Sequence, residues 1–126
     1  MADLITSLSF AASGMEAQAT RLRHVSENIA NTDTPGYRRK TISFDTAMDS
    51  GLVEAGPVRL DPGELARIYA PGHPLADEAG YYDGSNVDLV VEIADAREAQ
   101  RSYEANLKIF DQARQMTQSL FDLLRR

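Results

Sequence analysis

Apolar residues recur with helical spacing near the start of the chain. Gln18 interrupts a second, weaker apolar track, and Ser, Thr, Gln and Arg fill most other positions. A seven-residue repeat places side chains on one face of a helix, so the pattern predicts an amphipathic helix over residues 1–33. The residues of the main track are Leu8, Met15, Leu22 and Ile29.

The C-terminal third repeats this design. It contains neither Gly nor Pro from Asp88 onward. The four residues Ser85–Asp88 match the [ST]-x-x-[DE] capping signature that precedes many helices, and Asp88 and Glu92 suit the positive end of a helix dipole. We therefore predict a second helix over residues 86–126. Its apolar stripe contains Leu89, Ile93, Ala96, Tyr103, Leu107, Phe110, Leu120 and Leu124.

The two stripes permit two interpretations. They form either the internal core of a helical hairpin or a surface that becomes buried between subunits. Two amphipathic helices of unequal length bury little surface as an isolated pair, so assembly would supplement the contact. The candidate seam residues are Leu8, Met15, Leu22, Ile29, Ile93, Tyr103, Leu107 and Phe110.

Helix-breaking residues are confined to the middle segment, residues 34–85. All five prolines and seven of the eight glycines lie there. Thr34–Tyr37 has Pro at the second and Gly at the third position, which predicts a type II turn that ends the first helix. Short strands are predicted at Thr41–Phe44, Val58–Leu60 and Arg67–Tyr69. The segment is therefore either a small β-containing lobe or a loop that orders against partners.

Charge and composition exclude several classes of function. The net charge of −6 argues against nucleic acid as the main partner, and the basic run Arg38–Lys40 is too short to reverse this. The chain has no Cys, so no disulfide framework or thiolate zinc site is expected. No apolar run approaches the length of a membrane span, and the first residues lack the features of a secretory signal. Taken alone, these features predict a cytoplasmic protein.

The chain offers little material for catalysis or metal binding. His24 and Glu27 share a helix face, but a metal site would need further ligands, so His24 is interpreted as a surface or interface residue. The segment Asp83–Asp88 lacks the Gly and Glu spacing of a calcium loop. No phosphate loop, nucleophile elbow or zinc-protease motif is present. We therefore predict no catalytic residue, cofactor or metal, and no enzymatic activity.

Two segments carry a resemblance to a known family. Ser13–Leu22, followed by Asn28–Arg38, resembles the N-terminal motif of flagellar rod and hook proteins. In this interpretation two asparagines bond backbone at the frayed helix end or adopt the left-handed conformation, and the Pro-Gly pair redirects the chain. The motif and turn residues are Asn28, Asn31, Thr34, Pro35, Gly36 and Tyr37.

The C-terminal half resembles one subgroup of that family. Pro71–Asp77, Asn86–Leu89 and Arg101–Asn106 look like the FlgC subgroup, whereas the FlgB subgroup fits the first of these segments less well. Ala96 and Arg97 depart from the pattern, because similar proteins commonly have larger apolar residues there. A rod subunit of the FlgB type remains an alternative, as does a small soluble helical adaptor.

The resemblance implies a mainly α structural subunit of the proximal rod of the bacterial flagellar basal body. Its two long terminal helices would pair as an antiparallel coiled coil and polymerise with copies of itself and other rod proteins. The small irregular, β-containing segment would face outward or bridge to other rod proteins. The resemblance also implies delivery by the flagellar type III export apparatus, without a cleaved signal peptide, to a rod that crosses the periplasm.

Overall fold

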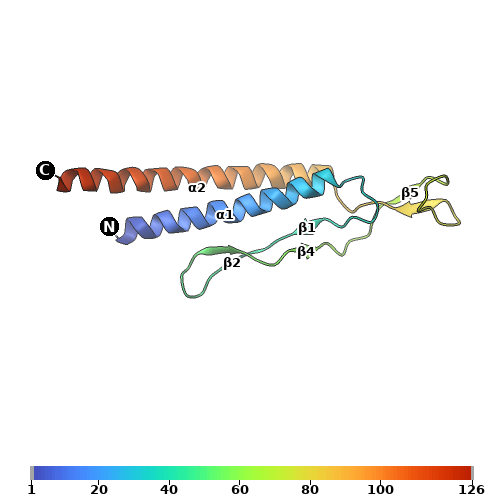
Figure 1. The fold of residues 1–126 in the computed structure, drawn as a ribbon, viewed down its shortest axis with the longest axis horizontal. Helices are drawn as coiled ribbons and strands as arrows, with labels where there is room; N and C mark the ends of the chain where they lie inside the picture. The colour runs from blue at the N-terminus through green and yellow to red at the C-terminus, as the bar shows by residue number, and fades with distance from the viewer. Residues whose placement is uncertain (1, 126) are drawn as a thin grey trace.

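A computed structural model describes residues 2–125 and shows an elongated molecule built on two long helices (Figure 1). The first helix, α1, spans Ala2–Ala30, and the second, α2, spans Leu89–Leu124. The two predicted helices are confirmed, but α1 ends before residue 33 and α2 begins after residue 86. The predicted helix ends at residues 1 and 126 lie outside the described part of the chain.

The start of α2 corrects the predicted cap. The cap residue is Asp88, whose side chain accepts a hydrogen bond from the backbone N–H of Val90 at 3.0 Å. The capping signature had placed this role at Ser85. The hydroxyl of Ser85 instead donates to the carbonyl oxygen of Thr32, just beyond α1. Ser85 therefore connects the entry of one helix to the exit of the other.

The two helices lie side by side and run in opposite directions. Arg21 of α1 contacts Asp95 of α2 at 3.1 Å, and a Cβ atom built on Gly14 would lie 2.8 Å from the side chain of Asn106. Higher residue numbers on α1 thus meet lower numbers on α2. Both termini lie at the same end of the molecule, where α2 extends beyond α1 (Figure 1).

The buried apolar side chains of the described residues are mainly small. Small residues allow close approach of two backbones but bury little apolar area. The core is correspondingly thin. Its buried apolar members are Ala11, Ala17, Val25, Ala99 and Ala113.

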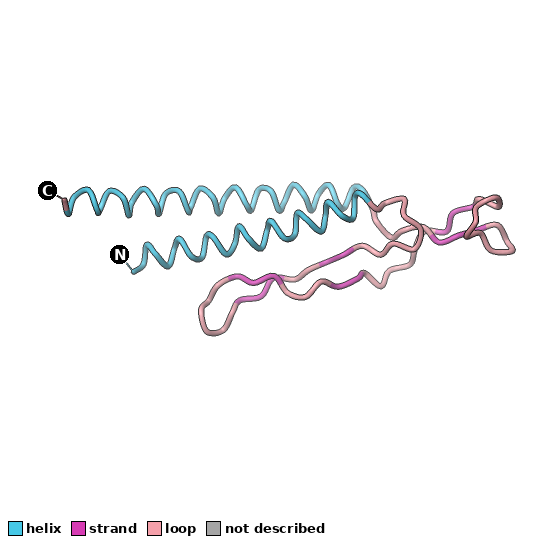
Figure 2. Tube along the Cα trace, viewed as in Figure 1, coloured by secondary structure: helices cyan, strands magenta, loops and turns pink. Residues whose placement is uncertain are grey.

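Four short strands form one interrupted hairpin, residues 40–60, which we call the long hairpin. Figure 2 shows its strands on the chain that runs back beside the helices. The ladder breaks at Pro57, which has no N–H to donate, and the predicted strand Thr41–Phe44 is accordingly split. The strands are β1 (Lys40–Thr41), β2 (Phe44–Thr46), β3 (Val53–Ala55) and β4 (Arg59–Leu60); β1 pairs antiparallel with β4, and β2 pairs antiparallel with β3.

A second hairpin, residues 67–83, lies at the end of the molecule opposite the termini (Figure 1). We call it the outer hairpin. Its strands β5 (Arg67–Tyr69) and β6 (Tyr81–Asp83) pair antiparallel. The strand predicted at Arg67–Tyr69 is confirmed, as is a β-containing middle segment. The aromatic rings of His73 and Tyr82 stack at a centroid distance of 3.9 Å. Over residues 2–125, neither helix has the length and apolar character needed to cross a membrane.

Candidate functional site

The exit turn after α1 has the predicted geometry. The backbone N–H of Tyr37 donates to the carbonyl of Thr34 at 3.2 Å, and Gly36 has a φ of 74°. With Pro35 at the second position, these are the features of a type II turn. The N–H of Gly36 lies 3.1 Å from the carbonyls of Asp83 and Gly84. The turn is therefore anchored to the chain that leaves the outer hairpin.

The two motif asparagines have different roles. Asn31 bonds the helix end as predicted, because its amide donates to the carbonyl of Glu27 at 2.8 Å. Asn28 instead reaches the backbone of Lys40, accepting from its N–H at 2.8 Å and donating to its carbonyl at 3.0 Å. The left-handed alternative is wrong, since no described residue other than Gly has a positive φ. Asn28 thereby fixes the start of β1 against α1.

Asn28 and Glu92 form the centre of a buried polar junction between the helices. The Asn28 amide donates to Oε2 of Glu92 at 3.2 Å, and its oxygen accepts from the hydroxyl of Tyr37 at 2.8 Å. Both Asn28 and Glu92 are 0% exposed. Burial raises the pKa of the Tyr37 hydroxyl above its ordinary value of 10.0. We call Asn28, Tyr37, Arg39, Asn86 and Glu92, which surround this contact, the polar junction.

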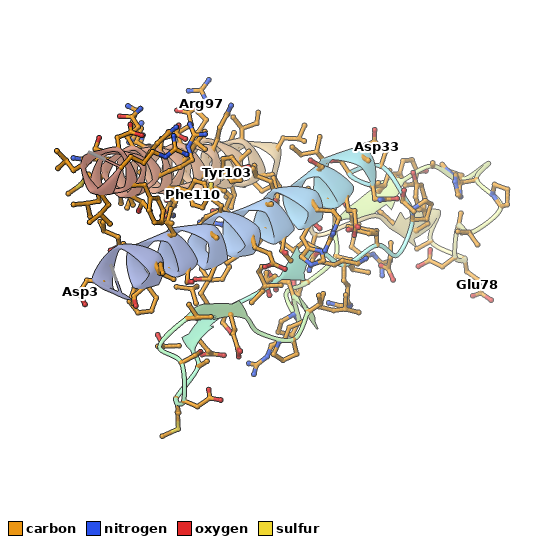
Figure 3. All side chains as sticks on the ribbon, turned by 60° about the vertical axis from the view of Figure 1, so that its left-hand side comes forward. Asp3, Asp33, Glu78, Arg97, Tyr103 and Phe110 are labelled. Atoms are coloured by element: carbon orange, nitrogen blue, oxygen red, sulfur yellow. The ribbon has the colours of Figure 1, made fainter. Side chains whose placement is uncertain are left out.

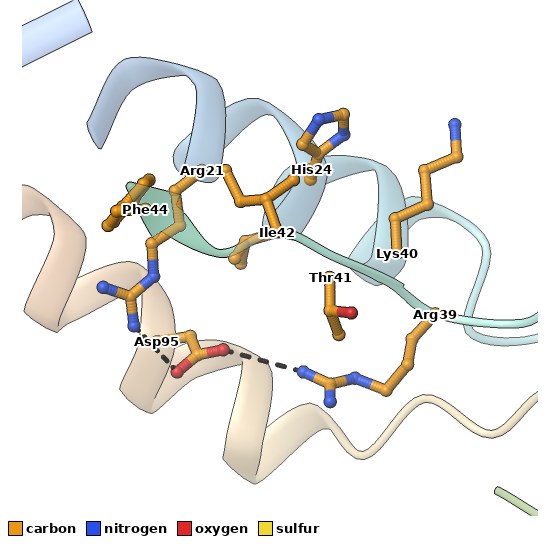
Figure 4. Close-up of a pocket in the computed structure, with 9 residues that line it drawn as sticks. Arg21, His24, Arg39, Lys40, Thr41, Ile42, Phe44 and Asp95 are labelled. Atoms are coloured by element: carbon orange, nitrogen blue, oxygen red, sulfur yellow. Dashed lines mark hydrogen bonds and ion pairs between the residues drawn. The ribbon is translucent and has the colours of Figure 1, made fainter. Parts of the chain in front are cut away.

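Arg39 compensates the buried carboxylate. Its Nε donates to Oε1 of Glu92 at 2.7 Å, and another of its nitrogens lies 3.4 Å from Asp61. The third nitrogen lies 3.6 Å from Asp95, the contact drawn in Figure 4. Burial, the largest single influence, would lower the pKa of Arg39, but the hydrogen bonds and negative charges of Glu92 and Asp61 together outweigh it and leave that pKa raised. A carboxylate buried without such a partner would cost several kcal/mol, on the order of 3 to 5.

Asn86 extends the junction to the chain between the two hairpins. Its side-chain oxygen accepts from the backbone N–H of Arg39 at 2.7 Å, and its amide donates to the carbonyls of Asp61 at 3.1 Å and Gly63 at 3.3 Å. The guanidinium of Arg38 donates to the same two carbonyls. The junction thus joins three segments: the chain around Arg39 before the long hairpin, the chain from Asp61 to Gly63 after it, and the chain around Asn86 before α2.

Only part of this junction is predicted by the sequence. The position of Glu92 near the start of a helix indicates a contact with the helix dipole, and no motif indicates a role for Arg39. Glu92 occupies a position of the same seven-residue repeat as the buried Ala99 and Ala113. An acidic residue at a repeat position that points into a helix contact was the available signal that it would be buried.

A cleft of about 320 Å³ lies beside the junction, between α1 and the start of the long hairpin (Figure 4). His24 lies in the wall of this cleft and is 8% exposed. The surface alternative for His24 is therefore wrong, because the side chain is buried within the chain. Its Nδ1 lies 3.8 Å from Glu27. A 2.7 Å hydrogen bond from Lys40 lowers the pKa of Glu27. Across residues 2–125, no cluster of three or more His, Cys, Asp or Glu could hold a metal.

The predicted seam residues lie beside the helix contact and are not fully buried in it. Ile29, Ile93 and Leu107 are 39%, 48% and 40% exposed. Tyr103 and Phe110 are half-buried, on the side of α2 that faces α1, whereas Arg97 points away (Figure 3). The half-buried α1 residues of the set are Leu8, Met15 and Leu22.

These residues share one flank of the helix pair. The long hairpin covers the other flank, where the N–H of Val53 donates to Ser13 at 3.2 Å and Ile109 lines a groove with Phe44. Leu107 is two positions before Ile109, hence about 200° around α2. The same rotation separates Ile93 from Asp95, which faces the long hairpin through Arg39. We call the flank away from the long hairpin the apolar face: Leu8, Met15, Leu22, Ile29, Ile93, Tyr103, Leu107 and Phe110.

The C-terminal end of α2 presents further apolar surface. Phe121, Leu123 and Leu124 are 49%, 61% and 77% exposed. A shallow groove of about 510 Å³ includes Met116, Leu120 and Leu123. Exposed apolar residues gathered along one element commonly mark an interaction surface. The paired helices therefore leave several large apolar side chains exposed.

Comparisons with known proteins identify the same segments. A family profile described as flagella basal body rod protein matches residues 8–38, and one described as flagellar basal body rod FlgEFG protein C-terminal matches residues 78–123. The chain is 45% identical to the flagellar basal-body rod protein FlgC of Agrobacterium fabrum, over 99% of this chain and 98% of that protein. Proteins of the same name from Aquifex aeolicus and Yersinia enterocolitica are each 34% identical, over 97% and 86% of this chain and 98% and 88% of theirs.

Proposed function

The chain belongs to the FlgC family of flagellar basal-body rod proteins, and from this premise we propose that it builds the rod by packing its apolar face against neighbouring subunits. It is a structural subunit of the basal-body rod and not an enzyme. The family membership gives the role. The apolar face is the part of the molecule that we propose carries it out.

The observation that supports this proposal is the exposure of large apolar side chains along both helices. Ile93 and Leu107 on α2 and Ile29 on α1 are each more than a third exposed, although all three lie on helical stripes. The buried apolar residues are mainly alanine. Helix pairs normally gain their stability by burying such stripes against further helices. Neighbouring subunits would supply those helices in a rod.

We further propose that the two helices pair as an antiparallel coiled coil. The seven-residue spacing of Ala99, Asn106 and Ala113 on α2 and the opposed contacts of Gly14 and Arg21 on α1 support this pairing. The long hairpin covers one flank and leaves the other open.

The partners that we propose are copies of this chain and other flagellar rod proteins. We also propose that the flagellar type III export apparatus delivers the chain to the proximal rod, and that this rod crosses the periplasm. Membership of the rod-protein family supports these assignments. The middle segment, residues 34–85, would face outward or contact other rod proteins, because it contains both hairpins and neither hairpin lies between the two helices.

The double variant Leu107→Ala, Phe110→Ala tests the proposal in cells that produce no other copy of the protein. We expect secreted protein at the normal level but few or no complete basal bodies and no motility, because two bulky residues of the apolar face are removed. A helix content equal to that of the unaltered chain, measured on purified protein, would separate lost assembly from lost folding.

The matched control is Glu104→Ala on the same stretch of α2. Glu104 is exposed and polar, so its removal should leave basal-body yield and motility unchanged. Normal rods from the Leu107→Ala, Phe110→Ala variant would contradict the proposal that this face is the assembly surface.

A further inference from the structure

The apolar contact between α1 and α2 does not by itself fix how far one helix is shifted along the other. Its buried apolar residues on α2, Ala99 and Ala113, belong to one seven-residue repeat. A slip of one heptad therefore exchanges one small contact for a similar one. Asn106 lies close to Gly14, but its amide donates to the carbonyl of Ser102 in its own helix at 2.9 Å. That contact does not bond the two helices together.

The polar junction, by contrast, has its bonds in one arrangement only. The side chain of Asn28 uses both its oxygen and its amide, on Tyr37, Lys40 and Glu92. The second carboxylate oxygen of Glu92 accepts from Arg39. A helix slipped by one heptad would carry Glu92 away from both partners and would leave the buried Asn28 amide and the Arg39 guanidinium without this carboxylate. An unpaired buried carboxylate or amide is costly, so slipped arrangements are disfavoured.

We propose that Asn28, Arg39 and Glu92 act as a lock that selects a single register between α1 and α2, and that this register aligns the two halves of the apolar face. Glu92 is the positioning residue, since it is the fully buried member contributed by α2. Buried polar groups are known to specify register in paired helices even where they add little stability.

The proposal that this register aligns the two halves of the apolar face rests on the proposed function. One half of the apolar face is contributed by α1 through residues such as Leu22, and the other by α2 through residues such as Leu107. A slip of one heptad would move these halves by about 10 Å relative to each other, at 1.5 Å per residue. It would also change how far α2 extends beyond α1. A neighbouring subunit that fits the aligned face would no longer fit the displaced one.

The register can be measured directly in the soluble chain, independently of assembly. The chain has no cysteine, so Ser26→Cys on α1 and Arg97→Cys on α2 accept two spin labels at exposed positions. Double electron–electron resonance measures the distance between the two labels, and it should give one narrow distance distribution for this labelled background. Adding Glu92→Met, which keeps an apolar side chain of similar length, should broaden the distribution or displace it by about 10 Å in axial offset. The helix content should stay unchanged.

Two variants are the controls. Glu92→Gln keeps the length of the side chain and one oxygen that can accept from Arg39, but it loses the second acceptor for the Asn28 amide, so its distance distribution should be narrower than that of Glu92→Met. Glu98→Gln removes a carboxylate that lies 3.3 Å from Arg21 across the helix contact, but Glu98 is 70% exposed, and its loss should not alter the distance. Together they separate loss of the buried lock from loss of any acidic residue on α2.

A distance distribution for Glu92→Met identical to that of the labelled background would overturn the lock. Loss of the helices in that variant would also overturn it, because the junction would then be required for folding and not for register. In cells, Glu92→Met should be secreted yet give few basal bodies. A displaced register together with normal rods would overturn the alignment step alone. The apolar face keeps its own test, the variant at Leu107 and Phe110.

Discussion

The two ends of the helix pair are built on opposite principles. At the end near the hairpins, Asn28 and Glu92 are completely buried and bonded, and Arg39 compensates the charge. At the end that holds both termini, Phe121 and Leu124 of α2 are 49% and 77% exposed. One end is closed by hydrogen bonds within the subunit. The other presents apolar surface that the subunit does not cover.

This difference separates the information for folding from the information for assembly. The polar junction satisfies its own groups and therefore needs no neighbour. The apolar surface of α2 and the apolar face gain stability only when something else covers them. A rod subunit with this division satisfies its buried polar groups internally and leaves its apolar surface for contacts with neighbours.

Removing the cation of the polar junction should have the largest effect on the stability of the closed end of the helix pair. Arg39→Ala leaves the fully buried Glu92 without its charged partner, and we expect the free energy of unfolding to fall by about 3 to 5 kcal/mol. Urea denaturation followed by helical circular dichroism measures this loss. Arg67→Ala is the control, because Arg67 also has an acidic partner, Asp77 at 2.9 Å, but is 57% exposed. Its removal should cost less than about 1 kcal/mol.

Equal losses for the two arginine variants would mean that the junction is no more important than a surface ion pair. The contrast between the two ends of the molecule would then have no energetic basis.

The next prediction concerns the backbone of the exit turn. Gly36→Val should cost about 1 to 3 kcal/mol, because a β-branched residue is strained at a φ of 74°. No atom outside the neighbouring residues lies within 4 Å of an added Cβ, so the cost arises from the backbone alone. Gly72 also has open space around it but no positive φ, and Gly72→Val is the matched control.

Amide hydrogen exchange shows where the loss falls. Gly36→Val should accelerate exchange around Tyr37 and Lys40, which the turn holds against α1, and should leave the exposed end of α2 unchanged. An equal acceleration throughout both helices would show that the junction and the open end do not behave as separate regions.

Features that depend on local sequence were predictable. Seven-residue spacing predicts the helices, because residues seven apart share a face whatever the rest of the chain does. Pro35 and Gly36 predict the exit turn, since each restricts or permits a specific backbone conformation. The strand at Arg67–Tyr69 follows from its own residues in the same way. The ends of the helices were predicted less accurately. Asp88 and not Ser85 caps α2, because the hydroxyl of Ser85 bonds the chain at the end of α1.

Spacing signals the burial of Glu92 but does not predict the polar junction around it. Its members come from α1, the start of the long hairpin and the start of α2, and only the folded chain brings them together. Asn28 fits an ordinary helix end equally well as a residue that bonds nearby backbone, and that was its predicted role. The apolar face was predicted as a set of residues. Its position on the flank away from the long hairpin depends on where that hairpin lies.

The smallest expected effect concerns acid and the outer hairpin. Asp77 accepts from the backbone N–H of Tyr81 at 3.0 Å and from Arg67 at 2.9 Å, and these bonds hold its pKa below the ordinary value of 3.8. A carboxyl group with a lowered pKa contributes stability that is fully present above its unfolded pKa and lost as the pH falls through its folded pKa. The outer hairpin should therefore loosen only below about pH 3.8.

Asp77→Asn tests this dependence, because an amide cannot titrate. Nuclear magnetic resonance of the amides of Tyr81 and Tyr82 between pH 6 and pH 2 should show a smaller change in the variant than in the unaltered chain. Glu78→Gln, at the exposed neighbouring position, should leave the pH dependence unchanged. If Asp77→Asn titrated like the unaltered chain, another acidic group would control the outer hairpin. That hairpin is held at its tip by exposed, titratable contacts, so it should respond to acid as a surface element does and not as the buried junction does.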